Sequence, residues 1–436
     1  MRPSVTRPLV LALLSSAPLL ALDPPNGYYA SVDTTSAATL RATLHEVIDD
    51  HTRFPYTSGS TDTWNILELA QENPTNPSAI LDVYRNRSFT KQGGANSSYN
   101  REHAWPSSYG FPDDGASNMP FTDCHMLQLS DDGYNTTRSN KPYGACTAGC
   151  NELTTDANDG NGGGSGVYPG QSNWTAGSFT NGTFEVNVFR RGDIARAMLY
   201  ADVRYEGGTH GSTGVAEPDL ILTDSLSLIA SGNTGSNEAV AYMGRLTVLL
   251  DWHYGDPVDD FERDRNDAVA AFQGNRNPFV DHPEWADCLF VGMCEPGSTY
   301  CSPAVANSTG LPALIEGRGS AVLANDDFRL LASQLPPNAA GFFLCSRTPG
   351  IVFQPGGSQG NLCLSGQIGR VVGGQILFSG VFGSFATDVD LGALPTPTGS
   401  VPAVAGETWH FQTWFRDAVG GQTTSNFSDG WEVTWQ

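Results

Sequence analysis

The hydrophobic pattern of this 436-residue chain changes near Pro296-Gly297. Before this point several segments carry apolar residues at helical spacing, most clearly within 40–48, 194–205 and 240–250. After it the apolar runs are short and are separated by turns rich in Gly and Pro, as at 341–344, 370–372 and 409–415. We therefore expect an α+β chain, with a helix-rich domain over 23–298 and an all-β, sandwich-like domain over 299–436.

Two further segments of the helix-rich domain have a distinct composition. A helix is expected from Asp256-Pro257 to about Gly274, because Asp is a good N-cap and Pro suits the first helical position. Between 145 and 182 the chain is rich in Gly, Asn, Thr and Asp, which predicts a surface insertion. Part of it suggests a calcium loop, but Gly160 stands where the EF-hand pattern requires a ligand, so an ordinary insertion is favoured.

The first 22 residues have the form of a secretory signal peptide. Two arginines precede an apolar stretch at 9–20, and the small residue Ala21 suits a cleavage site. The stretch is too short to span a bilayer, and no later one is longer. We therefore expect a secreted protein, either extracellular or periplasmic, that does not insert into a membrane.

Eight cysteines fit an oxidising compartment, and their even number favours disulfides. Cys146 and Cys150 have the spacing of metal ligands. No nearby second pair completes a set of four, so a zinc site is disfavoured.

Three short motifs within 99–144 carry groups that could perform chemistry. They are Asn-Arg-Glu-His-Ala-Trp-Pro at 100–106, Asp-Cys-His-Met-Leu at 123–127 and Asn-Thr-Thr-Arg-Ser-Asn at 135–140. Carboxylate and amide oxygens bind hard cations such as Mg²⁺ or Ca²⁺. An imidazole can accept a proton from water near neutral pH, and a cation can offset charge on a phosphate. Taken alone, each piece also has an ordinary interpretation, with His125 as a core histidine and Asn135 as a turn residue.

Together these motifs resemble the endonuclease I family, which comprises secreted or periplasmic bacterial nucleases with a His-Me finger (ββα-metal) site. Segments at 192–197, 250–258 and 274–279 also look like signatures of that family, and the agreement extends over about 40–285. The resemblance implies a metal-dependent, sequence-nonspecific endonuclease. It would hydrolyse DNA, with RNA as a second substrate, to products that carry 5′-phosphates.

The resemblance also implies roles for individual residues. His103 would be the general base, and Glu102 and Asn135 would hold one divalent cation, Mg²⁺ in the first place with Ca²⁺ and Mn²⁺ as alternatives. Arg138 would be a catalytic residue that contacts the scissile phosphate. The expected substrate-binding residues are Arg101, Lys141 and Arg276. We expect the protein to be a monomer.

Glu102 and His103 are neighbours, and neighbours on a regular strand point to opposite faces. They can serve one site only if the strand ends or bends there, which Pro106 and the following loop favour. In the ββα-metal arrangement Asn135 would come from the helix that follows.

Other residues within the matching region have more than one interpretation. The corner at 275–277 could line a substrate cleft or lock the end of a helix. Asp193 and Arg196 are three residues apart, which predicts a structural ion pair. Trp105 is expected in the core.

The C-terminal domain resembles a β-rich module found at the ends of some secreted bacterial proteins. The residues that carry this resemblance are Cys301-Ser302-Pro303, 307–310, 355–364 and Trp409-His410-Phe411. No catalytic constellation is visible in it. We expect a disulfide between Cys301 and Cys363, which leaves Cys345 for another partner.

The net charge of −23 argues against a broad basic surface for nucleic acid. Within 84–112, however, Glu102 is the only acidic residue and four residues are basic. A small basic region on an otherwise acidic protein predicts that nucleic acid binds locally, with an affinity that depends only weakly on salt. Two other functions stay open: a phosphodiesterase for a smaller phosphate ester and an exported, non-catalytic binding protein. The complete set of Glu102, His103 and Asn135 favours an enzyme over the second.

Overall fold

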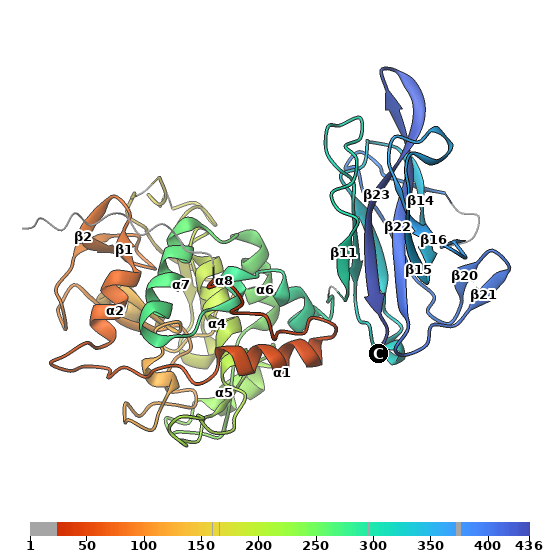
Figure 1. Ribbon diagram of the computed structural model, residues 1–436. Coiled ribbons are helices and arrows are strands. Elements are labelled where there is room, and N and C mark those ends of the chain that lie inside the picture. The colour runs from red at the N-terminus through yellow and green to blue at the C-terminus, as the bar shows by residue number, and fades with distance from the viewer. Residues whose placement is uncertain (1–23, 159, 165, 295, 372–375) are drawn as a thin grey trace, which may run out of the picture.

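The computed structural model describes residues 24–158, 160–164, 166–294, 296–371 and 376–436. The expected signal peptide therefore lies outside the described residues. Figure 1 shows helices α1 to α8 together in one part of the molecule and strands β11 to β23 together in another. The α-helices are α1 (Ala37–Ile48), α2 (Thr63–Ala70), α3 (Asp132–Arg138), α4 (Arg191–Arg204), α5 (Leu226–Gly232), α6 (Leu246–Gly255), α7 (Asp260–Gln273) and α8 (Pro278–Asp281).

Helix α4 lies at the centre of the helix-rich part. Every one of its residues after Arg191 is buried, as expected for a helix with neighbours on all sides. Helices α1, α6 and α8 pack against it. Leu40, Leu44 and Ile48 of α1 are fully buried in the same core, so the helical stripes at 40–48 and 194–205 are confirmed.

The predicted helix over 240–250 is wrong in its first half. Residues Val240–Met243 form β10, which pairs in parallel with β9 (Asp219–Leu222), and the helix α6 starts only at Leu246. A short apolar run fits either element, and pairing with a distant strand decided between them here.

The next helix, α7, ends where the sequence predicts but begins later. Gly274 adopts a left-handed conformation with φ 86° at its C-cap, a geometry that glycine tolerates without strain. The N-cap is Asp259, whose side chain accepts a hydrogen bond from the backbone N–H of Glu262, rather than Asp256. Asp256 is instead the C-cap of α6.

An antiparallel strand pair followed by a helix holds the motifs singled out above. Strand β4 (Tyr99–His103) pairs with β5 (Leu127–Asp131), so that Glu102 faces Gln128 and His103 faces Leu127. Helix α3 follows β5 directly, and the Asp131 side chain caps it by accepting hydrogen bonds from the first turn. This order of elements is the one that the resemblance implies. Its identification as a ββα-metal core stays a prediction.

The segment predicted as an insertion at 145–182 contains regular structure. Two of its segments, β6 (Asn151–Leu153) and β7 (Asn173–Ala176), form a sheet with β8 (Thr183–Glu185). Cys146 and Cys150 form a disulfide at its start. The other strands in this part are β1 (Glu72–Asn73), β2 (Asn76–Leu81) and β3 (Ser88–Thr90).

The strand-rich part has a hydrophobic core of its own, with Phe343, Phe411 and Trp431 among its buried residues. One sheet has the strand order β11-β23-β22-β14-β17, with β18 also paired to β14, and β12, β13 and β19 form a second sheet. The strands are β11 (Ser298–Tyr300), β12 (Leu314–Arg318), β13 (Arg329–Ser333), β14 (Ala340–Ser346), β15 (Thr348–Val352), β16 (Leu362–Ser365), β17 (Gly369–Arg370), β18 (Leu377–Phe378), β19 (Phe385–Asp388), β20 (Leu394–Thr396), β21 (Gly399–Val401), β22 (Thr408–Val419) and β23 (Gln422–Thr434). The division into domains at 298/299 stays a prediction.

Six of the eight cysteines form disulfides. The expected pair Cys301–Cys363 is confirmed, and a third disulfide joins Cys288 to Cys294. The expectation from the even count is wrong for Cys124 and Cys345, which are buried thiols. Burial raises the pKa of Cys345 to about 12, so this thiol is not ionised near neutral pH.

Candidate active site

Glu102 and His103 occupy the last two positions of β4, so the strand ends where one shared site requires. The Glu102 side chain is 4% exposed. Its Oε1 accepts hydrogen bonds from the Tyr84 hydroxyl at 2.8 Å and from Arg138 Nη1 at 2.9 Å. Burial raises the pKa of Glu102, while Arg138 and Tyr84 act in the opposite direction. Oε2 makes no hydrogen bond with the described residues.

The His103 ring is held by a backbone carbonyl. Its Nε2 lies 2.9 Å from the oxygen of Phe121, and because a carbonyl can only accept, Nε2 must carry the proton. The lone pair of Nδ1 is thereby left to act as a base. The rings of Tyr56 and Phe121 pack against the His103 ring, with centroids 6.0 and 4.7 Å away, and against each other. Burial, aided by the nearby positive charges of Arg101 and Arg138, lowers the pKa of His103 to about 4, which keeps the imidazole neutral near pH 7.

Arg138 ties the end of β4 to helix α3. The guanidinium is 1% exposed and donates to Glu102 Oε1, to the carbonyl of His103 at 2.9 Å and to the carbonyl of Ala104 at 2.7 Å. The ring of Tyr143 lies 4.5 Å from its Cζ atom. These contacts orient Glu102 and fix the backbone on both sides of His103. The predicted contact of Arg138 with a scissile phosphate stays a prediction.

Asn135 lies one turn before Arg138 on α3, on the side that faces β4. Its Nδ2 donates to the carbonyl of Arg101 at 3.4 Å, which leaves Oδ1 without a partner among the described residues. The carboxylate Oε2 of Glu102 and the amide Oδ1 of Asn135 are thus the oxygens that remain available. Both are hard ligands, and they fit a cation such as Mg²⁺, which keeps several waters and needs few protein ligands. Within the described residues no cluster of three or more His, Cys, Asp or Glu side chains could hold a metal.

The predicted substrate-binding residues make contacts within the fold. Arg101 donates to the carbonyl of Tyr56 and to Thr63 Oγ1, and its guanidinium lies over the rings of Tyr56 and Trp64. Lys141 donates to the carbonyl of Thr137. Their roles toward a substrate stay predictions.

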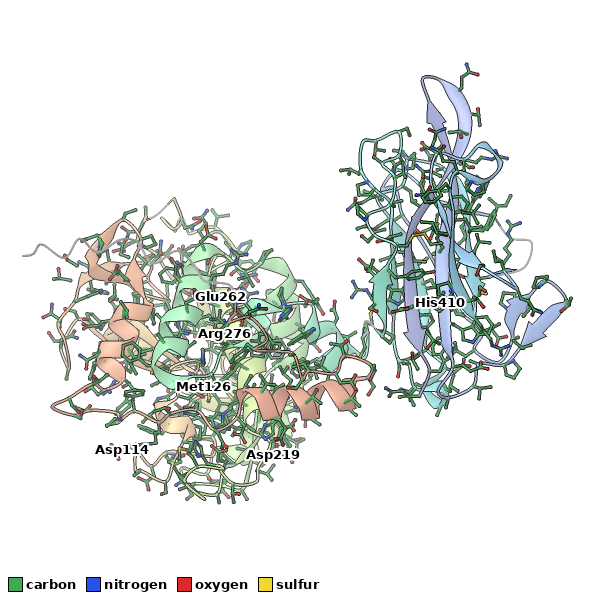
Figure 2. The ribbon with its side chains drawn as sticks, in the orientation of Figure 1. Asp114, Met126, Asp219, Glu262, Arg276 and His410 are labelled. Atoms are coloured by element: carbon green, nitrogen blue, oxygen red, sulfur yellow. A yellow bond between two sulfur atoms is a disulfide. The ribbon has the colours of Figure 1, made fainter. Side chains whose placement is uncertain are left out.

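Arg276, labelled in Figure 2, lies in the helix-rich part at the corner between α7 and α8. It forms ion pairs of 2.7 Å with Asp267 and Asp281. None of its contacts involves Glu102, His103, Asn135 or Arg138. The structure brings those four residues together and does not bring Arg276 to them.

The neighbours of Arg276 also hold the fold together. Asn275 donates to the carbonyl of Ile48 and to the Tyr200 hydroxyl, and Asn277 caps α8. These contacts favour the structural interpretation of the 275–277 corner. The predicted ion pair between Asp193 and Arg196 is wrong, because Asp193 pairs with Arg190 and Arg196 pairs with Glu262.

A buried carboxylate for which the sequence predicts no role lies two residues after Phe121, whose carbonyl holds the His103 ring. Asp123 is fully buried, and its Oδ2 accepts hydrogen bonds from the hydroxyls of Tyr200 at 2.8 Å and Tyr205 at 2.9 Å. Its Oδ1 accepts from Gln273 Nε2 and from the backbone N–H of His125. Burial acts to raise the pKa of Asp123, but the nearby histidines and these hydrogen bonds hold it well below its usual range.

This network holds the segment whose carbonyl orients His103. Asp123 stands two residues after Phe121, and the N–H of Cys124 donates to Gln273 Oε1 at 2.6 Å. Arg265 donates to the carbonyl of Cys124, also at 2.6 Å. The Asp-x-His motif was visible in the sequence, but the side chains that bind Asp123 come from distant segments and nothing in the motif points to them. His125, as expected, is buried, with Nε2 3.0 Å from the carbonyl of Asn275.

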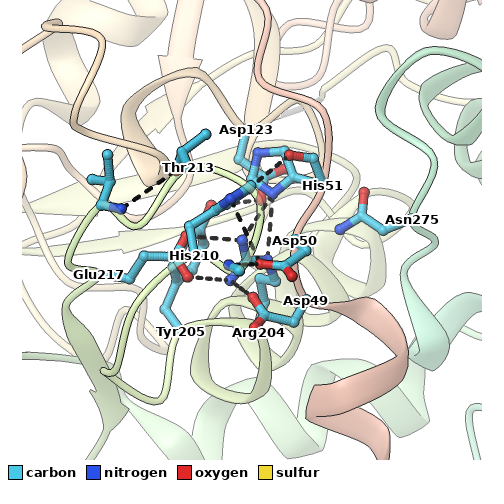
Figure 3. Close-up of polar contacts among 12 residues, drawn as sticks. Asp49, Asp50, His51, Asp123, Arg204, Tyr205, His210, Thr213, Glu217 and Asn275 are labelled. Carbon is cyan, nitrogen blue, oxygen red and sulfur yellow. Dashed lines mark hydrogen bonds and ion pairs between the residues drawn. The ribbon is translucent and has the colours of Figure 1, made fainter.

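A second buried network adjoins the first (Figure 3). Arg204 forms ion pairs with Glu217 at 2.9 Å and with Asp49 at 2.6 Å, and it donates to Nδ1 of His51. Burial lowers the pKa of His51 to about 3, so the ring is neutral and can accept from the guanidinium. These contacts anchor the segment after α1 to the end of α4.

A neutral imidazole beside a carboxylate and an amide oxygen supplies the functional groups that an enzyme needs to hydrolyse phosphodiester bonds. Comparison with known proteins agrees. The family model for endonuclease I matches residues 36–284, and the chain belongs to this family, whose members hydrolyse phosphodiester bonds in nucleic acids. Within the described residues no helix is both long and apolar enough to cross a membrane.

The chain is also similar to two proteins named extracellular ribonuclease. The one from Bacillus subtilis (strain 168) is 35% identical over 288 residues, which cover 65% of this chain and 84% of that protein. The one from Bacillus amyloliquefaciens is 35% identical over 276 residues, which cover 63% of this chain and 81% of that protein.

Proposed function

We propose that this protein is a secreted, metal-dependent endonuclease that cuts DNA and RNA without sequence preference and leaves 5′-phosphates. The observation that carries the proposal is the contact between His103 Nε2 and the Phe121 carbonyl. It leaves Nδ1 as a base at the end of the strand that also carries Glu102. The extracellular relatives and the three disulfides support secretion.

In this mechanism His103 Nδ1 takes a proton from the water that attacks the phosphorus. The Phe121 carbonyl keeps the ring oriented and stabilises the imidazolium that forms. Glu102 Oε2 and Asn135 Oδ1 would hold Mg²⁺, with Ca²⁺ or Mn²⁺ as alternatives. When bound, the cation supplies positive charge that offsets charge on the phosphate and on the leaving 3′ oxygen. Arg138 donates to Glu102 Oε1, which leaves Oε2 for the cation.

Activity on both nucleic acids follows from the choice of nucleophile. Because His103 activates water, the reaction needs no 2′-hydroxyl, so DNA and RNA are both substrates. Contacts to phosphates rather than to base edges make cutting independent of sequence. The name of the two similar proteins supports RNA as one substrate.

Removal of divalent cations is expected to abolish cutting. Plasmid DNA and a single-stranded RNA should both be cut in Mg²⁺ and remain intact in excess EDTA, with activity restored when Mg²⁺ is added back. End-labelling should find phosphate at the 5′ ends of the products. If the protein cuts neither nucleic acid in Mg²⁺, Ca²⁺ or Mn²⁺, it is not the proposed enzyme. Equal cutting in EDTA would show that the reaction does not depend on a divalent cation.

Deletion of residues 299–436 is expected to leave at least half of the nuclease activity. The residues of the proposed site all precede 139, and the buried core of the strand-rich part contains only residues from 313 onward. The measurement is the specific activity of the truncated and full-length proteins, with circular dichroism to verify folding. A folded fragment without activity would show that the strand-rich part takes part in catalysis or in substrate binding.

A further inference from the structure

A depression of about 430 Å³ lies beside the segment that follows helix α3. Its walls are the loop closed by the Cys146–Cys150 disulfide, the turn between β7 and β8, and the start of α6. The polar side chains in the wall are Thr147, Thr180, Asn181, Thr183 and Arg245. Its volume falls within the range of sites that bind small molecules.

One short segment of chain connects this depression to the proposed active site. Pro142 lines the depression and stands four residues after Arg138, a separation that the chain can span over no more than about 14 Å. The next residue, Tyr143, bonds through its hydroxyl to Tyr84, which donates to Glu102. The segment that lines the depression is thus the one that begins at Arg138 and carries Tyr143, a residue bonded to the partner of Glu102.

Arg245 brings an unneutralised positive charge to this site. Its guanidinium is half-buried and makes no hydrogen bond, ion pair or ring contact with the described residues. Other arginines of the helix-rich part are ion-paired, including Arg138, Arg196, Arg204 and Arg276. On a protein with a net charge of −23, a free guanidinium in a depression marks a place where an anion is favoured.

The rest of the wall suits a phosphate joined to a sugar. The side chains of Thr147, Thr180 and Asn181 make no hydrogen bonds with the described residues, so their donors are available to a ligand. The remaining wall positions include small residues such as Ala145, Ala148 and Gly177, which leave the space open.

We propose that this depression is a nucleotide subsite that binds one phosphate and its sugar from the substrate strand, away from the bond that is cut. Arg245 pairs with the phosphate, and the hydroxyl and amide groups of the wall donate to phosphate and sugar oxygens. This inference rests on the proposed function, because the strand must also lie at His103.

The first test measures binding of a 12-nucleotide single-stranded RNA to the full-length His103→Ala protein over a range of salt concentrations. Adding Arg245→Ala is expected to weaken binding roughly tenfold at low salt. It should also reduce the slope of log K against log salt by about 0.7, the value for one phosphate contact on a single strand. Arg263→Ala removes the same charge from an exposed position on α7 and should change neither quantity. An unchanged slope in the Arg245 variant, or equal effects in both variants, would overturn the subsite.

The second test separates the subsite from catalysis. Arg245→Ala and Ala148→Trp, which fills the depression, should each raise KM for the 12-nucleotide RNA about tenfold in the otherwise wild-type enzyme. Hydrolysis of bis(p-nitrophenyl) phosphate, which has no second phosphate to place at Arg245, should be unchanged. If the wild-type protein hydrolyses neither substrate, the proposed function fails. If it hydrolyses both and the two variants match it on RNA, only the subsite fails. In a further outcome, inorganic phosphate binds at Arg245 in the wild-type protein although Arg245→Ala leaves the affinity for RNA unchanged. That result would also overturn the subsite, because the site would then bind free phosphate.

Discussion

Replacing His103 with alanine is expected to lower kcat for cutting of DNA and RNA by about 10²- to 10⁴-fold, the usual contribution of a general base. The neutral ring offers its Nδ1 lone pair to the attacking water, and no other imidazole shares the end of β4. Binding of the substrate should change little, since the uncharged ring contributes no ion pair to a phosphate.

The measurement is single-turnover cutting of a labelled oligonucleotide in Mg²⁺, with RNA affinity determined separately. His282→Ala provides the matched control, because His282 is about one-third exposed and lies at the end of α8. It should cut as fast as the wild type. Cutting by His103→Ala at the wild-type rate would mean that another group activates the water.

Replacing Asp123 with asparagine is expected to lower the free energy of unfolding by about 3–5 kcal/mol, the range for breaking a buried charged network. Both carboxylate oxygens accept two hydrogen bonds each. An amide has one oxygen and one NH₂ group, so in either orientation the NH₂ group would face two donors. The Tyr200 and Tyr205 hydroxyls, or the Gln273 amide and the His125 N–H, would then be left unsatisfied in the core.

Urea denaturation followed by circular dichroism measures this loss. Asp260→Asn makes the same chemical change at a position that is 94% exposed and should alter stability by less than about 0.5 kcal/mol. Tyr205→Phe removes one donor to Asp123 and should lower stability by only about 1 kcal/mol. An Asp123→Asn protein as stable as the Asp260→Asn control would show that the network contributes little.

The same substitution is expected to lower kcat more than it raises KM at temperatures where the variant is folded. Asp123 acts through the segment that carries the Phe121 carbonyl, so its loss should disturb the orientation of His103 and leave substrate contacts in place. A folded variant with wild-type kcat would limit Asp123 to a structural role.

Local patterns predicted much of the fold. The stripes of α1 and α4 follow from apolar spacing, and the end of α7 follows from Gly274, because these signals act between residues a few positions apart. The start of α7 and the strand β10 were misassigned. Asp256 and Asp259 are both good caps, and a four-residue apolar run does not distinguish strand from helix.

The sequence by itself determined which groups the candidate site contains. Glu102 and His103 share one motif, and Asn135 lies on the helix that follows the paired strand, as expected from the order of the motifs. Only the tertiary structure decided how those groups are held. Arg138 turns inward to Glu102, Arg196 pairs with Glu262 rather than with its neighbour Asp193, and Asp123 receives donors from α4 and α7. The physical reason is that a buried charge needs several partners at once, and segments distant in the sequence can supply them only after they have packed together.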